Sequence, residues 1–383
     1  TVRADVSVDG KPVDVAVAMG PGPGDIEKSI GTSYAQKPQG TLFQNGSVER
    51  LNPKSLTTEP GREGAFRWAG VDDQYFMSIA LLEDKPARID YENVSVPDGA
   101  GKTRSFVSYA VNPEGVPADL RFFVGPKSFD LLKSIDQQLV KSVNFGMFAW
   151  LAVPLLQALK GINEYIGNYG WSIIALTFLI NLVLFPLRHK SFVSMKKLQA
   201  LQPEMKAIQD RYGKLKATDP ARQKMNQELM ELYKQRGVNP ASGCVPMLLT
   251  MPVLFAFYSL LSAAIEIRGA PWIFWITDLS RHDPLYVTPV LMGATMVLQQ
   301  RMTPSTADPM QQKMMLLMPV VFTGMFLWAP SGLVIYWFFS NLFAIAQQYG
   351  TNRLTGNVPV KTIRPPAERR VKKVGEGKTN GAK

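Results

Sequence analysis

The chain has 383 residues and a formal net charge of +11, but its charge is unevenly distributed. Residues 1–144 hold 16 Lys or Arg against 19 Asp or Glu, whereas residues 188–237 hold 12 against 5 and residues 350–383 hold 9 against 2. Two basic blocks therefore flank apolar sequence, which is typical of an integral membrane protein and argues against a basic soluble one.

Few residues offer catalytic or metal-binding chemistry. Cys244 is the single cysteine, which excludes an intrachain disulfide. His189 and His282 lie far apart without a cysteine or acidic cluster beside them, so we expect no metal site. The chain has no phosphate-binding loop pattern, and within its apolar segments no nucleophile has a histidine at helical or motif spacing. We therefore expect neither an enzyme nor a cofactor.

Residues 1–144 are predicted to form a β domain. Short alternating runs such as "VDVAVAM", "FMSIALLE", "ARIDYENVSV" and "SFVSYAV" are interspersed with the turn signals "DG", "PGPG", "PDGAG" and "NPEG". This spacing favours an all-β sandwich or barrel. Helical periodicity then appears over Lys127–Val143. Because the domain has the character of an exported one, we expect an N-terminal targeting segment to precede it in the whole protein.

The next segment, Phe145–Ile162, is apolar but contains Pro154, Gln157 and Lys160. A membrane span and a helix lying in the membrane interface both fit this pattern, and we favour the interfacial helix, with residues 145–167 as helix and connector.

Five apolar segments follow and are predicted to span a membrane. Several are shorter than the roughly 20 residues that cross a full bilayer, which suggests local thinning. Five crossings place the β domain and the basic tail on opposite sides, and the positive-inside rule puts the tail in the cytoplasm. The predicted spans are Asn168–Leu187, Cys244–Ile265, Leu285–Gln299, Met314–Trp328 and Ser331–Gln348.

Two basic segments are assigned to the cytoplasm. Residues 189–237 carry apolar residues at helical spacing on either side of the breaker "GKLKATDP", which predicts a helical hairpin within the 168–349 core. Residues 350–383 are basic and rich in Pro and Gly, and are predicted to be disordered. Both segments suit anionic lipids, and an RNA-rich surface such as a ribosome is the alternative.

Polar residues recur on one face of several spans. Thr177, Asn181 and Arg188 share a face of the first span, and Tyr336, Ser340 and Gln347 share a face of the last. Thr288, Met292, Thr295 and Gln299 do the same in the third. Such groups either hydrogen-bond between helices or line a water-filled cavity, and the pattern alone leaves both open.

Several motifs together resemble a known family. "NYGWSIIALTF", "LQPEMKAIQDRYG", "VNPASGCVPMLLTMPVLFAFY" and "SNLFAIAQQY" are similar, in consistent order, to the YidC/Oxa/Alb membrane protein insertases. "WAGVDDQYF" and "RFFVGPKSFDLL" resemble the end of the large periplasmic domain of the Gram-negative YidC type. The resemblance covers residues from about Val143 to Tyr349, besides these two periplasmic segments.

The resemblance implies a periplasmic β-supersandwich domain, an interfacial helix and a five-span inner-membrane core. It implies an insertase and chaperone that moves nascent inner-membrane proteins into the lipid through a hydrophilic groove. This would act without ATP hydrolysis, alone or with the Sec translocon (SecYEG, SecDF). The ribosome would dock on the basic tail and hairpin, and no DNA partner is implied.

The resemblance also assigns residues. Thr177, Asn181, Gln300, Tyr336 and Trp337 match groove positions of the family, and the shared polar faces add Arg188 and Ser340 to the predicted groove. An apolar face for the sliding substrate is predicted at Met251, Phe255, Met318, Phe322 and Met325. One departure is notable, because much of the family carries an arginine where this chain has Asn181. We expect Arg188 to supply positive potential from the groove's mouth instead, and Asn181→Leu to impair insertion more than Asn181→Arg.

Two other functions are weighed against insertion. A small-molecule transporter would need ionisable residues within the spans or an inverted repeat, and the sequence offers neither. A β domain that epimerises sugars on a membrane anchor is disfavoured because residues 1–144 contain no histidine, although sugar binding stays open.

Overall fold

The computed structural model describes most of the chain, and it forms two compact units. The first consists of Thr1–Ile180, Met251–Thr295 and Pro319–Asn341, and the second of Asn181–Thr250, Met296–Met318 and Leu342–Lys383. The predictions for Cys244, for the breaker at 213–220 and for the tail beyond 355 lie outside the described residues. The residues that the structure describes are 7–8, 11–12, 16–20, 38–53, 55–57, 59–97, 103–113, 120–212, 221–239, 245–303 and 309–355.

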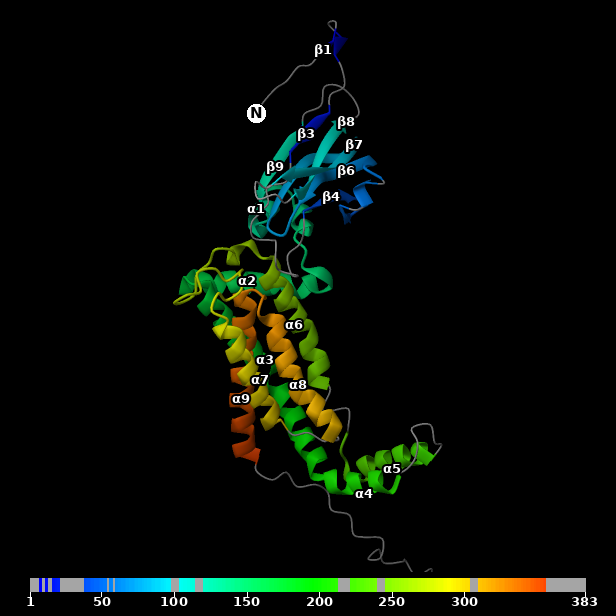
Figure 1. Cartoon of the computed structure of the whole chain (residues 1–383), viewed down its shortest axis with the longest axis vertical. Coiled ribbons are helices and arrows are strands. Elements are labelled where there is room, and N and C mark those ends of the chain that lie inside the picture. The colour runs from blue at the N-terminus through cyan, green and yellow to red at the C-terminus, as the bar shows by residue number, and fades with distance from the viewer. Residues whose placement is uncertain are drawn as a thin grey trace, which may run out of the picture. The chain divides into compact units, whose positions relative to one another are not determined.

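The first unit contains a 7-stranded antiparallel sheet (Figure 1). Its order is β3-β8-β7-β6-β4-β5, with β9 also paired to β7, and β1 and β2 form a separate ribbon. The expected antiparallel β domain is confirmed, whereas a sandwich of two sheets stays a prediction. The strands are β1 (Ser7–Val8), β2 (Lys11–Pro12), β3 (Val17–Met19), β4 (Gln39–Gln44), β5 (Ser47–Leu51), β6 (Gly61–Asp72), β7 (Phe76–Pro97), β8 (Thr103–Pro113) and β9 (Arg121–Pro126).

Strand β7 joins two alternating runs that the sequence separates. Glu83 and Asp84 have φ angles of 55° and 64°, and the pairing register of β6 shifts between Phe66 and Trp68. Such an irregularity changes which alternate residues face the core. Before the bend, even-numbered Leu82 faces the core. After the bend, odd-numbered residues such as Ile89 face the same core. That core includes Leu42, Phe66, Val71, Ala80, Leu82, Ile89, Tyr91, Val107, Tyr109 and Val111.

Two short helices, α1 (Phe129–Ile135) and the 3-10 helix η2 (Leu139–Ser142), follow β9. The single helix expected over Lys127–Val143 is therefore divided. Asp136 lies at the break, where its carboxylate accepts hydrogen bonds from the Arg67 Nε at 2.7 Å and from the Gln138 N–H at 2.7 Å. The Ser142 hydroxyl lies 3.6 Å from the sulfur of the fully buried Met77 on β7, so η2 packs against the sheet.

The remaining helices coincide with the predicted apolar segments. The clearest difference is α3, which continues past the predicted end at Leu187 to Ala200. Among the described residues, α3 is the one helix long and apolar enough to cross a membrane, with shorter apolar helices at Thr250–Ala263 and Met314–Phe326. The helices are α2 (Ala149–Ile166), α3 (Tyr169–Ala200), α6 (Val245–Ala263), α7 (Val287–Met302), α8 (Pro309–Phe326) and α9 (Ser331–Thr355).

These helices bury polar as well as apolar side chains, and they expose many large apolar ones. Polar side chains are buried on α3, α6, α7 and α9, including Ser172, Thr177, Asn181, Ser262, Thr288 and Asn341. Large apolar side chains are exposed, including Phe178, Leu182 and Val183 on α3 and Met314, Leu317, Val320 and Val321 on α8. Exposed apolar surface of this extent indicates a membrane or protein interface, and apolar side chains that face outward while polar ones are buried suit lipid.

In the second unit, α4 (Gln202–Tyr212) packs against α5 (Ala221–Arg236) (Figure 1). Their contact is apolar at its centre and ionic at its edges. Arg236 pairs with Glu204 at 2.7 Å, and Arg211 pairs with Glu228 at 2.9 Å. The apolar cluster comprises Leu198, Leu201, Met205, Leu229, Leu232, Tyr233 and Val238.

Candidate functional site

Two polar residues lie in the middle of the apolar part of α3. Thr177 is fully buried, and its hydroxyl donates to the carbonyl of Ile173 at 2.6 Å, one turn earlier. This bond to the same helix lowers the cost of burying a hydroxyl group. Asn181 follows one turn later and is 7% exposed, whereas its neighbour Val183 is 75% exposed.

Arg188 reaches back along α3 to Asn181. Its Nη1 donates to the Asn181 Oδ1 at 2.5 Å, across the seven residues that separate them. The two positions are almost two helical turns apart, on one face, so a long arginine side chain can bridge them. A positive charge is therefore present beside the amide of Asn181, although the residue at position 181 carries none.

Two neighbouring aromatic residues of α9 have different surroundings. Tyr336 is buried and stacks on Phe257 of α6, with ring centroids 4.2 Å apart. Trp337 is half-buried against Phe322 and Phe326 of α8, with centroids 5.7 and 5.0 Å away. These contacts fix both side chains between helices of the first unit. Ser340, one turn after Tyr336, is half-buried.

The predicted apolar face is partly accessible. Phe255, Met318 and Met325 are exposed, whereas Met251 and Phe322 are half-buried. The Phe255 ring also stacks on Phe148, just before α2, with centroids 5.8 Å apart. Phe255 and Met325 lie in the first unit and Met318 in the second, so no single surface is described from them.

One residue that the sequence interpretation missed is Asn341 on α9. It is buried, and its Nδ2 donates to the Thr295 Oγ1 of α7 at 3.2 Å. In the second unit, the Gln348 Nε2 similarly donates to the Thr303 Oγ1 at 2.9 Å, just after α7. An asparagine within the apolar run "WFFSNLFAI" was the available signal, but it lies off the face defined by Tyr336 and Ser340.

Two predicted polar positions lie on α7, one near its end and one near its start. Gln300 is half-buried near the end of α7. Thr288, expected on a polar stripe, serves the start of α7 instead. Its N–H and hydroxyl both donate to the Asp283 carboxylate, at 2.7 and 2.8 Å. This is the way a helix start satisfies its free N–H groups, and it assigns Thr288 a structural role.

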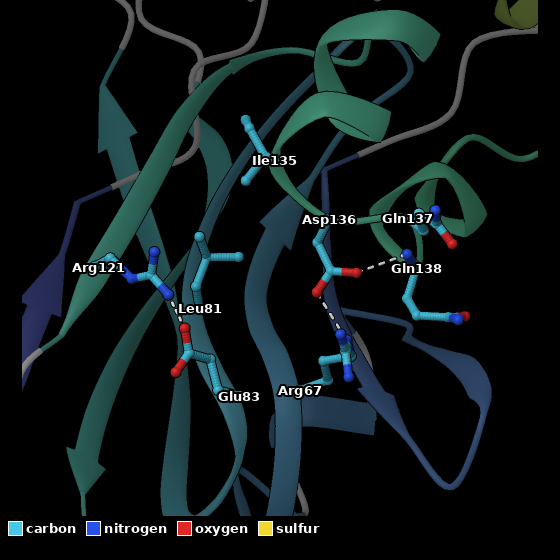
Figure 2. A pocket seen from close by; sticks show the side chains of 8 residues that line it. All are labelled: Arg67, Leu81, Glu83, Arg121, Ile135, Asp136, Gln137 and Gln138. Carbon is cyan, nitrogen blue, oxygen red and sulfur yellow. Dashed lines mark hydrogen bonds and ion pairs between the residues drawn. The ribbon is translucent and has the colours of Figure 1, made fainter.

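The β domain has a pocket of about 480 Å³, shown in Figure 2. Its four charged side chains are already paired, because Arg67 binds Asp136 and Arg121 binds Glu83. The hydrogen bond and charge of Asp136 raise the pKa of Arg67. Such paired groups offer little net charge to a ligand. The remaining lining residues are Leu81, Ile135, Gln137 and Gln138.

Comparison with known proteins gives two family matches that divide the chain. The model of the YidC periplasmic domain matches residues 27–158, and the model of the 60Kd inner membrane protein matches residues 161–357. The second match covers more than half of the chain, and the junction between the two falls within α2.

Curated relatives carry one name. A protein of Geobacter sulfurreducens is 44% identical over 309 residues, covering 80% of this chain and 57% of the relative. A protein of Campylobacter jejuni is 43% identical over 283 residues, covering 74% and 51%. Both are named membrane protein insertase YidC. The chain thus spans little more than half the length of these relatives.

A solved structure is also similar to this chain. It is a crystal structure of an active YidC insertase with the first transmembrane domain resolved. The TM-score is 0.44 at 18% identity, with 81% of this chain and 83% of that chain covered.

Proposed function

Because the chain belongs to the 60Kd inner membrane protein family, we propose that it inserts hydrophobic segments of nascent proteins into the bacterial inner membrane. Relatives named membrane protein insertase YidC support this activity. The activity is one of binding and partition rather than covalent chemistry, and we propose that it needs neither a cofactor nor ATP.

The proposed topology has five spans formed by α3, α6, α7, α8 and α9. The net charge of −3 in residues 1–144 and of +7 in residues 188–237 supports a periplasmic β domain and a cytoplasmic α4–α5 pair. The basic residues after α9 support a cytoplasmic C-terminus in the same way. The matched model of a periplasmic domain over residues 27–158 agrees with this orientation.

The single observation that carries the mechanism is the pair formed by Asn181 and Arg188. A buried amide and a half-buried guanidinium on one face of an apolar helix are expensive in lipid, so this face is expected to turn away from lipid and to reach a hydrated space at Arg188. We propose that this space is a groove lined by Thr177, Asn181, Arg188, Gln300, Tyr336, Trp337 and Ser340.

A hydrated groove lowers the barrier to insertion. Polar flanks of a substrate segment cost several kcal/mol to move through hydrocarbon, and water in the groove keeps them solvated. The apolar stretch then leaves along the apolar face proposed at Met251, Phe255, Met318, Phe322 and Met325. Its burial in lipid gains roughly 25 cal/mol per Å², which makes release favourable.

Partners follow from the same proposal. Nascent inner-membrane proteins are the substrates, and the charge of residues 188–237 and 350–383 suits a ribosome and anionic lipid headgroups. Cooperation with the Sec translocon is proposed on the family relationship alone.

The test is replacement of a host's own insertase. Cells depleted of it receive this chain with an N-terminal membrane helix added, and insertion of a short single-span protein is measured by protease protection. We expect insertion to recover. If the chain accumulates in the membrane but the substrate stays protected inside, the proposed function is wrong.

A matched pair of variants locates the activity. Asn181→Leu removes the buried acceptor of Arg188, whereas Val183→Leu alters an exposed residue of the same helix. We expect the first to impair insertion and the second to leave it unchanged. Equal activity of the two variants would exclude a role for the polar face of α3.

A further inference from the structure

The loop between α6 and α7, residues 264–286, holds an aromatic ring out into its surroundings. Phe274 is 85% exposed and has a φ of 51°, in the left-handed region that a bulky side chain rarely adopts. Tyr286, at the end of the same loop, is also exposed and has a φ of 54°. Left-handed backbone costs an ordinary residue roughly 1–2 kcal/mol, so neither conformation arises by local preference.

Hydrogen bonds enforce the conformation at Phe274. The Trp272 N–H donates to the Ile276 carbonyl at 3.0 Å, which closes a tight turn with Phe274 at its tip. The next residue, Trp275, donates its ring N–H to the Asp283 Oδ1 at 2.9 Å. The Trp275 ring is thereby held toward the protein. The Phe274 ring stacks on it, with centroids 5.9 Å apart, and leaves its outer face exposed.

Asp283 is well suited to hold this turn. It is fully buried and also accepts bonds from the Leu285 N–H and from both donors of Thr288. Burial alone would raise its pKa, but these hydrogen bonds outweigh burial and lower the pKa of Asp283. The carboxylate therefore stays ionised and keeps all its acceptor positions at neutral pH.

The turn is fixed to the ends of two membrane helices. The Trp272 ring lies against the backbone of Gly170 and contacts Trp171 edge-on at the start of α3, with centroids 5.8 Å apart. At the start of α9, the Ser331 N–H and hydroxyl both donate to the Arg281 carbonyl at 2.6 Å. Phe274 is consequently carried on a rigid support at one end of the helices.

Other exposed aromatic rings lie at the ends of neighbouring helices of the same unit. An aromatic side chain gains free energy at a membrane–water interface, where its apolar body leaves water, and such rings gather at that level. Apolar residues exposed farther along α3 in this unit, Phe178 and Leu179, indicate where the hydrocarbon begins. The rings are Trp150 and Tyr165 on α2, Trp171 on α3, Tyr286 before α7 and Trp328 after α8.

We propose that Phe274 is a lipid anchor, held in a strained turn so that its ring inserts among the lipids at the periplasmic face of the membrane. The partner is the bilayer interface itself, and burial of the ring offsets the backbone strain. The inference rests on the membrane-spanning arrangement proposed above, but not on the insertase activity.

The test places one spin label on the full chain in vesicles of phosphatidylethanolamine and phosphatidylglycerol. Cys244→Ser removes the single cysteine, and Phe274→Cys then accepts the label. Matched labels replace Val183, expected in hydrocarbon, and Val124, an exposed residue of β9 expected in water. Relaxation by oxygen and by a water-soluble nickel complex reports the depth of each label.

We expect the ratio of oxygen to nickel accessibility at 274 to be several-fold above that at 124 and below that at 183. A ratio at 274 equal to that at 124, with 183 still in lipid, would overturn the anchor while sparing the membrane topology. Low accessibility of 274 to both reagents would place it in a protein contact and also overturn the proposal. Aqueous labels at both 183 and 274 would reject the topology as well.

Discussion

The substitution Asn181→Asp separates charge from geometry at the centre of α3. Aspartate has the shape of asparagine and keeps the oxygen that accepts the bond from Arg188 Nη1. It adds a negative charge, however, which cancels the field of the guanidinium. We therefore expect the variant to fold and to lose activity toward substrates whose exported tail is acidic.

The magnitude follows from the charges. A carboxylate about 6 Å from the guanidinium gains roughly 3 kcal/mol at an effective dielectric constant of about 20, and about half of that in a wetter groove. Since each 1.4 kcal/mol corresponds to about a tenfold change in rate, insertion of an acidic-tailed substrate should slow by roughly ten- to a hundredfold.

The assay compares two substrates that differ only in the tail, one acidic and one neutral, by protease protection over time. The neutral-tailed substrate should insert at nearly the unaltered rate, which controls for folding and membrane abundance. The double variant Asn181→Arg with Arg188→Asn keeps both partners but exchanges their positions. It should insert the acidic-tailed substrate as the unaltered chain does. If Asn181→Asp inserted the acidic-tailed substrate at the unaltered rate, the electrostatic argument would be refuted. If it lost activity toward both substrates equally, the Asn181–Arg188 pair would have only a structural role.

Three further predictions concern stability. Lys127→Met removes the ammonium that lies 2.6 Å from the buried carboxylate of Asp72, so it should cost about 3–5 kcal/mol in unfolding free energy by denaturant titration. Adding Asp72→Leu should recover most of that loss. Gly70→Ala would place a methyl group 2.2 Å from a backbone oxygen of β7, and faster proteolysis of the β domain should reveal the strain. The pKa of Asp283 is lower in the folded chain than in the unfolded one. The ionised carboxylate should therefore contribute fully to stability above about pH 4, and this contribution should decline as the pH falls through the folded pKa. Asp283→Asn should abolish that acid dependence when unfolding is followed by Trp275 fluorescence.

Helix positions were the most predictable part of the fold. Each apolar segment is a distinct run, so composition alone locates α6 and α7 to within about three residues. It misses the start of α8, which begins at Pro309 rather than Met314, and the end of α9, which reaches Thr355 rather than Gln348. The end of α3 was misplaced because the apolar signal stops at Leu187 while the helix does not. The following "RHKSFVSMKKLQA" contains neither Gly nor Pro, so nothing in it breaks the helix.

The β domain was predictable in kind but not in strand count. The bend at Glu83 and Asp84 lets β7 continue where the alternating pattern is interrupted. The left-handed backbone at these two residues results from the pairing of β7 with β6 and β9. The local sequence carries no sign of that pairing.

Polar residues within the helices showed the same limit. Spacing located Asn181 and Arg188 on one face, and their hydrogen bond agrees with that expectation. Spacing also grouped Thr288 with Thr295, whereas one binds Asp283 and the other accepts a bond from Asn341. A helical wheel reports which residues share a face but not which neighbour faces them, so partners on other helices stay hidden.

The arrangement at Asn181 has an energetic advantage over an arginine at the same position, the residue that the resemblance assigns to much of the family. A guanidinium at the middle of a span costs roughly 2.5–3.5 kcal/mol on insertion, and this cost falls toward the end of the span. Arg188 lies beyond Pro186, near the end of the apolar sequence, and its side chain extends inward to the amide of Asn181. In the proposed topology, the side chain extends toward water while α3 enters the membrane, and it turns inward once the other helices surround it. The Arg188 guanidinium thus places a positive charge near the centre of the span, while its free-energy cost of insertion is that of an arginine near the end of the span.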